Sequence, residues 1–141
     1  MTLTASACST GGDEVLAEPG DLRHIHDLAL DDDGTLLAAS HAGLYRIEGL
    51  DRAVLVGTEQ HDLMAMTRTD GGLMASGHPD LRLQEYRVEG KEPHLGVIES
   101  GDMGRTWDQE GMLGDADFHA FAATADGFYA AEATGGTIWY G

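Results

Sequence analysis

An internal repeat constrains the fold of this chain more than any other feature of its sequence. Three segments that each begin with a histidine can be stacked on one another, over residues 26–40, 61–76 and 119–131. Each segment combines an apolar run, an Asp-Gly pair and a second apolar run. An Asp-Gly pair between apolar runs is a strong hairpin signal, because both residues tolerate a positive φ. Further short apolar runs follow these hairpins at 44–47, 53–56, 95–98 and 137–140.

The repeat predicts an all-β chain organised as a β-propeller of four-stranded antiparallel blades. A single four-stranded sheet cannot bury both of its faces, so it must stack on neighbouring sheets, as propeller blades do. A β-sandwich, the competing all-β fold, would not explain a histidine that recurs at one position of the repeat. We expect blades over about 22–57, 58–114 and 115–141, with residues 79–93 forming a loop insertion in the second blade.

The predicted propeller is partial, with about three blades, because complete propellers have at least four. An open array of blades would expose apolar sheet faces and an unpaired strand edge. We therefore expect this chain to be a fragment of a larger propeller. The alternative is that copies of the chain associate to close the ring.

A sequence motif in the second predicted blade matches the pattern S-x-D-x-G-x-T-W, through Ser100, Asp102, Gly104, Thr106 and Trp107. Asp102 can accept backbone N–H groups of its own turn, and Gly104 can adopt the positive φ that such a turn needs. The motif resembles the Asp box of BNR-repeat β-propellers, which include sialidases, sortilin-type receptors and photosystem assembly factors. The resemblance implies a structural turn between the third and fourth strands of a blade, away from the usual ligand face.

Short histidine motifs accompany the Asp box: His24-Ile-His26, His61-Asp, Ser-Gly-His78-Pro and Asp-Phe-His119-Ala. With these motifs, residues 22–141 resemble a family of small bacterial extracytoplasmic Asp-box propellers that are often labelled glycosyl hydrolases. The resemblance supports the fold more than the chemistry, since one fold can carry many functions.

The candidate site consists of histidines at the end of the blades where a propeller binds ligands. In a propeller, the innermost strand of each blade begins there and the second strand ends there. The predicted ligands of a metal ion or small molecule are His24, His26, His41, His61, His78 and His119. Converging imidazoles suit a transition metal such as Cu or Zn better than Mg or Ca. Asp27 and Asp62 are expected to point into the packing between blades instead.

Two other functions remain open from the sequence. The histidines could be structural, bonding water or neighbouring backbone, in a protein-interaction scaffold. The chain could also belong to a sialidase-like glycosyl hydrolase, which needs two carboxylates, or a tyrosine with an acid partner, at the sugar. Its arginines recur at no repeat position that would clamp a substrate carboxylate, and Glu132 is the one carboxylate placed for hydrolysis. We therefore expect binding rather than catalysis.

The N-terminal residues and the charge indicate where the protein acts. Cys8 follows small residues and precedes a Gly-rich stretch, as in a bacterial lipoprotein signal, so residues 1–21 are predicted to be a signal remnant and lipid-anchored tether. This predicts an extracytoplasmic protein, anchored as a lipoprotein or secreted, that meets a membrane only through the lipid. The net charge of −17 argues against nucleic-acid binding.

Overall fold

The computed structural model describes residues 16–17, 22–49 and 52–141, and the expectation of an all-β chain is confirmed for them. Over these ranges the chain forms short β-strands and a single 3-10 turn, η2 (Gln84–Tyr86), with no α-helix. No helix of this part is long and apolar enough to cross a membrane. Cys8 and most of the predicted tether lie outside the described residues.

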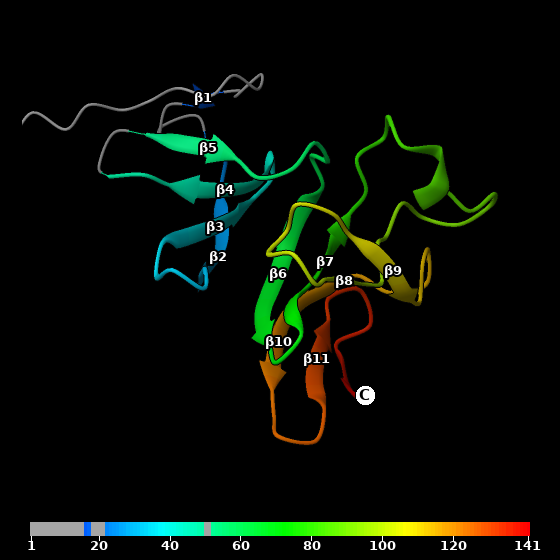
Figure 1. Cartoon of the computed structure of the whole chain (residues 1–141). Helices are drawn as coiled ribbons and strands as arrows, with labels where there is room; N and C mark the ends of the chain where they lie inside the picture. The colour runs from blue at the N-terminus through cyan, green and yellow to red at the C-terminus, as the bar shows by residue number, and fades with distance from the viewer. Residues whose placement is uncertain (1–15, 18–21, 50–51) are drawn as a thin grey trace, which may run out of the picture.

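The strands form three open antiparallel sheets, each from consecutive strands of the chain (Figure 1). The first sheet has the order β1-β5-β4-β3-β2, with β1 (Leu16–Ala17), β2 (Ile25–Leu30), β3 (Leu36–Ser40), β4 (Gly43–Ile47) and β5 (Ala53–Leu55). The second sheet contains β6 (Asp62–Thr69), β7 (Gly72–His78), β8 (Val97–Ser100) and β9 (Asp108–Gly111). The third sheet contains β10 (Phe118–Ala123), β11 (Phe128–Glu132) and β12 (Thr137–Tyr140).

The sheets meet along the first strand of each hairpin. Strand β6 packs between β2 of the first sheet and β10 of the third, and the sheets fan out from these strands in Figure 1. The N–H of Met66 donates to Asp27 Oδ2 over 3.1 Å between the first and second sheets. The N–H of Phe118 donates to the buried Ser76 Oγ over 3.2 Å between the second and third. Asp27 thus lies in the packing between sheets, as expected.

The main core fills the space between the first two sheets. Its buried side chains include Leu37 and Leu44 of the first sheet, Leu63 and Ile98 of the second, and Trp107. A smaller cluster, including Met74, Val97, Phe118 and Ala130, joins the second and third sheets. Burying one large apolar side chain stabilises the fold by about 1.5–3 kcal/mol, so these clusters hold the sheets in fixed relative positions.

A β-bulge recurs at the same register in the first strand of each of the hairpins β2–β3, β6–β7 and β10–β11. The unpaired residue is His26 in β2, Met64 in β6 and His119 in β10. The equivalence of His61 with His26 and His119, inferred from the sequence, is therefore wrong. Strand β6 is longer than β2 and β10, with eight residues against six, and His61 lies three residues before the bulge.

The turn formed by the Asp-box-like motif of residues 100–107 lies between β8 and β9, at the end of the second sheet opposite His78. Asp102 Oδ1 accepts the N–H of Thr106 at 2.9 Å, and Asp102 Oδ2 accepts the Thr106 hydroxyl at 2.7 Å. Gly104 has φ +88°, and a Cβ there would lie 2.1 Å from Leu44 Cδ2 of the first sheet. The turn therefore needs glycine for both conformation and space, and it helps to seat the second sheet on the first.

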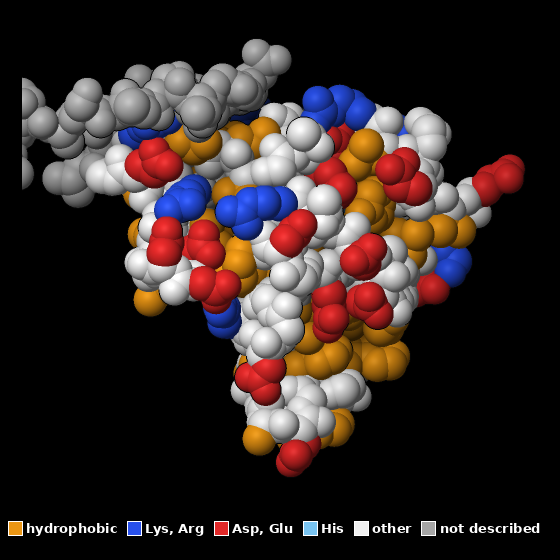
Figure 2. Space-filling model, viewed as in Figure 1, with side chains coloured by type: hydrophobic (Ala, Val, Ile, Leu, Met, Phe, Trp, Pro, Cys, Tyr) orange, Lys and Arg blue, Asp and Glu red, His pale blue; other side chains and the backbone are white. Residues whose placement is uncertain are grey.

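The surface is acidic, in keeping with the composition. Figure 2 shows Asp and Glu side chains scattered over one face of the molecule, with hydrophobic side chains exposed near the third sheet. In that sheet β12 leaves Ile138, Trp139 and Tyr140 exposed at the edge.

Candidate metal centre

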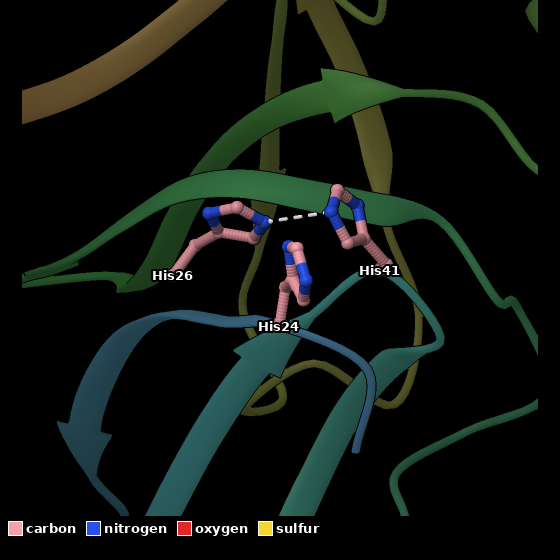
Figure 3. Close-up of side chains that lie close together, drawn as sticks. All are labelled: His24, His26 and His41. Atoms are coloured by element: carbon pink, nitrogen blue, oxygen red, sulfur yellow. Dashed lines mark hydrogen bonds between the residues drawn. The ribbon is translucent and has the colours of Figure 1, made fainter. Parts of the chain in front are cut away.

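Three predicted histidines come together beside the first sheet. His24 precedes β2, His26 lies in β2, and His41 follows β3, and their imidazoles point toward one another in Figure 3. One nitrogen from each ring lies within 4.8 Å of the other two, and the Nε2 atoms of His26 and His41 are 3.3 Å apart. Zinc–nitrogen bonds of about 2.0–2.1 Å place two ligand nitrogens about 3.4 Å apart in a tetrahedral site. The two rings are hydrogen-bonded to each other, as the dashed line in Figure 3 marks, at a separation that also suits two ligands of one ion.

Two local departures from regular strand geometry produce this arrangement. His24 has φ +47°, in the left-handed region that residues other than glycine rarely adopt. His26 is the bulged residue of β2, and a bulge redirects the side chain it carries. The sequence-based reasoning placed both rings on one side by simple strand alternation. The structure brings them together by a strained turn followed by a bulge instead.

A carboxylate from the second sheet orients His41. Asp62 is the first residue of β6, and its Oδ1 atom lies 2.5 Å from Nδ1 of His41. Because the carboxylate accepts, Nδ1 carries the proton, and Nε2 keeps its lone pair directed toward His26. Ligand histidines in metal sites are commonly fixed by a carboxylate in this way. Asp62 thus reaches the neighbouring sheet, as expected, and in doing so it contacts a candidate ligand.

The electrostatics favour the neutral form that binds metals. Partial burial and the neighbouring His41 lower the pKa of His26, although Asp62 acts in the opposite direction. A neutral imidazole has the free lone pair that a metal ion requires. The lowered pKa therefore favours the form of His26 that can act as a ligand.

A second group in the described part of the chain also has the residues to hold a metal: His78, His94 and Asp117. His78 ends β7, His94 precedes β8, and Asp117 precedes β10. The other oxygen of Asp62, Oδ2, lies 3.2 Å from His78 Nδ1. One carboxylate therefore contacts a histidine of each group.

His119 joins this arrangement through Asp117 rather than through the first group. Its Nε2 lies 2.9 Å from Asp117 Oδ2, which is 3.6 Å from His78 Nε2. A continuous series of polar contacts thus runs from the first sheet to the third, through His41, Asp62, His78, Asp117 and His119.

His61 belongs to neither group, and its predicted role as a ligand is not supported. The ring is 1% exposed, and both of its nitrogens already have partners. The N–H of Asp80 donates to Nδ1 at 3.0 Å, so Nε2 donates to Glu59 Oε2 at 2.7 Å. Burial lowers its pKa, against the opposing influence of Glu59. The contacts of His61 instead fit the alternative interpretation, in which a histidine has a structural role and holds neighbouring segments together.

Glu132, the carboxylate considered for hydrolysis, closes its own turn. It accepts the N–H groups of Thr134 at 2.9 Å and Gly135 at 2.6 Å, and it contacts the Thr134 hydroxyl. The hydroxyl of Thr134 and these N–H groups lower its pKa, so the carboxylate is ionised and already bonded. A general acid for glycoside cleavage needs a raised pKa instead.

Sequence reasoning missed two residues of the second group, His94 and Asp117, and it did not assign Asp62 a role beside the histidines. When the three first strands of the hairpins are aligned on their bulged residues, Asp62 and Asp117 fall at equivalent positions. The residue two positions before the bulge is His24 in the first sheet, Asp62 in the second and Asp117 in the third. In every sheet, the residue at this position is polar and belongs to one of the two groups or contacts their histidines. His94 lies outside the repeat.

No protein-family model, curated protein or solved structure matches this chain. The function must therefore be argued from the geometry of these side chains.

Proposed function

We propose that this chain folds as an extracytoplasmic, partial β-propeller that binds a divalent transition metal at His24, His26 and His41. The observation that carries the proposal is the separation of 3.3 Å between the Nε2 atoms of His26 and His41, with Asp62 fixing the ring of His41. Zn²⁺ suits this set best, because three imidazoles in a compact array match its tetrahedral preference, whereas Cu²⁺ prefers a tetragonal arrangement.

The propeller assignment is supported by the way in which the sheets repeat. Each first strand carries a bulge at the same register, and these strands pack side by side with the sheets radiating from them. The exposed edge at β12 is what an incomplete ring of blades would leave. The Asp-box turn and the lipoprotein-like residues around Cys8 support the same family and the same extracytoplasmic setting.

Three protein ligands leave a fourth position on the ion for water or a small ligand. Two of the three rings are exposed and one is half-buried, so a ligand can reach this position from solvent. We therefore propose binding of the metal, with or without an exogenous ligand, rather than glycoside hydrolysis.

Zinc titration of matched variants by isothermal titration calorimetry tests the proposal. The wild-type chain, stripped of metal by a chelator, is expected to bind Zn²⁺, and His24→Ala and His26→Ala should each remove one bound ion. Asp126→Asn is the control, because it changes an exposed side chain in the β10–β11 turn, outside both histidine groups. Unchanged stoichiometry and affinity in both ligand variants would show that these rings do not hold the ion.

A further inference from the structure

We propose that the chain holds a second divalent metal ion at His78, His94 and Asp117, and that Asp62 couples this ion to the one at His24, His26 and His41. The second site stands on its own geometry, whereas the coupling rests on the proposed function of the first. Two imidazoles and a carboxylate with an open position form a ligand set that suits Zn²⁺.

The three residues converge from separate parts of the second and third sheets. Their ligand atoms lie within 4.8 Å of one another, and the rings of His78 and His94 have centroids 5.7 Å apart. The Nε2 of His78 and the Oδ2 of Asp117 are 3.6 Å apart, too far for a direct hydrogen bond. A zinc ion bound to both would hold them about 3.4 Å apart, so only a small closure is needed.

Asp117 gives independent support, because its carboxylate is buried and incompletely bonded. The residue is 6% exposed, and its buried Oδ1 has no hydrogen-bond partner among the residues that the structure describes. A buried carboxylate with an unpaired oxygen is costly, and a cation bound to the same carboxylate, through either oxygen, offsets that cost. His119 contacts only the other oxygen, Oδ2.

Asp62 prepares His78 in the same way as it prepares His41. Its Oδ2 accepts from His78 Nδ1 at 3.2 Å, which leaves the lone pair of His78 on Nε2, the atom nearer Asp117. Each site thus has a histidine whose Nδ1–H is held by the same carboxylate. Loss of this carboxylate should weaken both sites, because such supporting contacts contribute about 10–100-fold to metal affinity.

Sharing the carboxylate predicts that the two ions bind with negative coupling. An ion on His41 makes its Nδ1–H more acidic, so Asp62 is drawn toward His41 and supports His78 less. The two cations also repel each other. Coupling between sites is reciprocal, and typical coupling energies correspond to about 5–150-fold in affinity. We expect the second Zn²⁺ to bind at least about 5-fold more weakly when the first site is filled.

The test is zinc titration of the full chain by isothermal titration calorimetry, with circular dichroism to check that each variant is folded. Wild type is expected to bind two ions, while His94→Ala and His24→Ala each bind one. Asp62→Asn should weaken both sites by about 10–100-fold, whereas Asp126→Asn, an exposed aspartate in the β10–β11 turn, should change neither. His94→Asn replaces His94→Ala if the latter does not fold. The remaining site in His24→Ala should bind more tightly than the second ion of wild type.

The outcomes separate the two proposals. A single ion lost in His24→Ala but kept in His94→Ala would overturn the second site and leave the proposed function standing. A single ion lost only in His94→Ala would overturn the proposed function at His24, His26 and His41 and leave the second site standing. Two ions whose affinities are the same in wild type and Asp62→Asn would overturn the coupling alone, and no bound ion would overturn both sites.

Discussion

Asp62 accepts a hydrogen bond from His41 across the boundary between two sheets, with 2.5 Å between Oδ1 and Nδ1. His41 directly follows β3 of the first sheet, and Asp62 begins β6 of the second sheet. The candidate metal ligand is therefore oriented by a residue that reaches it only when the sheets are packed. Changes that shift β6 should consequently affect both stability and metal affinity.

Gly77 offers a direct test of this dependence. A Cβ at Gly77 would lie 2.0 Å from the carbonyl oxygen of Asp62 and 2.8 Å from the nitrogen of Met64, and Gly77 has φ +141°. Gly77→Ala should destabilise the fold by more than about 1–2 kcal/mol, the cost of a positive φ alone, and should weaken zinc binding. Urea unfolding and zinc titration measure the two effects.

Gly34→Ala is the control for that experiment, because Gly34 has φ +82° but no neighbouring atom within 4 Å of the methyl group that alanine would add. Gly34→Ala should lower the free energy of unfolding only by the cost of placing alanine at a positive φ, and it should bind zinc as wild type does. Equal losses of stability in both variants would mean that contact with the Asp62 backbone is not what limits position 77.

Asp102 should contribute to stability without affecting the metal. Asp102→Ala removes the acceptor for two groups of Thr106 and for the Ser100 hydroxyl. Because Thr106 is exposed and water can replace the lost acceptor, the free energy of unfolding should fall by about 0.5–1.5 kcal/mol, the net contribution of an ordinary hydrogen bond. Zinc affinity should be unchanged in the folded variant, because the turn lies at the far end of the second sheet. Asp102→Asn, which keeps one oxygen acceptor, should show a smaller loss, and a change in zinc affinity would contradict the separation of turn and site.

His61 should make stability depend on pH. Burial lowers its pKa in the folded chain below the ordinary value of 6.5, so on acidification the unfolded chain takes up its proton first. The contribution to stability is complete above about pH 6.5 and is lost as pH falls toward the folded pKa, with a slope of up to about 1.4 kcal/mol per pH unit. Urea unfolding of wild type and His61→Gln between pH 7.5 and about 5 measures the difference in slope. Parallel profiles would show that His61 does not titrate with unfolding.

The sequence supports much of the architecture because hairpin signals are local. Asp-Gly pairs between apolar runs predicted the hairpins β2–β3, β6–β7 and β10–β11, and the Asp-box residues marked the β8–β9 turn. These features depend on a few adjacent residues, so they can be recognised without knowing what packs against them.

The register and the site could not be predicted in the same way. A β-bulge inserts one unpaired residue, and nothing in the residues around Met64 distinguishes a bulge from regular strand. Stacking the segments by their histidines therefore misaligned His61 and hid the equivalence of His24, Asp62 and Asp117. His94 lies outside the repeat and reaches its group only through the tertiary fold.

His24 provides the sharpest test of whether backbone strain serves the metal site. Its φ of +47° costs an ordinary residue about 1–2 kcal/mol, and glycine is free of this cost. His24→Gly should therefore be more stable than His24→Ala by about 1 kcal/mol, the reverse of the usual order in regular structure. Both variants lack the imidazole, so both should lose the zinc ion of this site.

Urea unfolding in the presence of a chelator isolates the conformational difference at position 24, and zinc titration reports the lost ligand. If His24→Gly is more stable than wild type without metal while binding one ion fewer, the strained backbone is kept for the ligand it presents. Stability of His24→Ala equal to or greater than that of His24→Gly would mean that His24 carries no such strain, and the left-handed turn would lose its functional explanation.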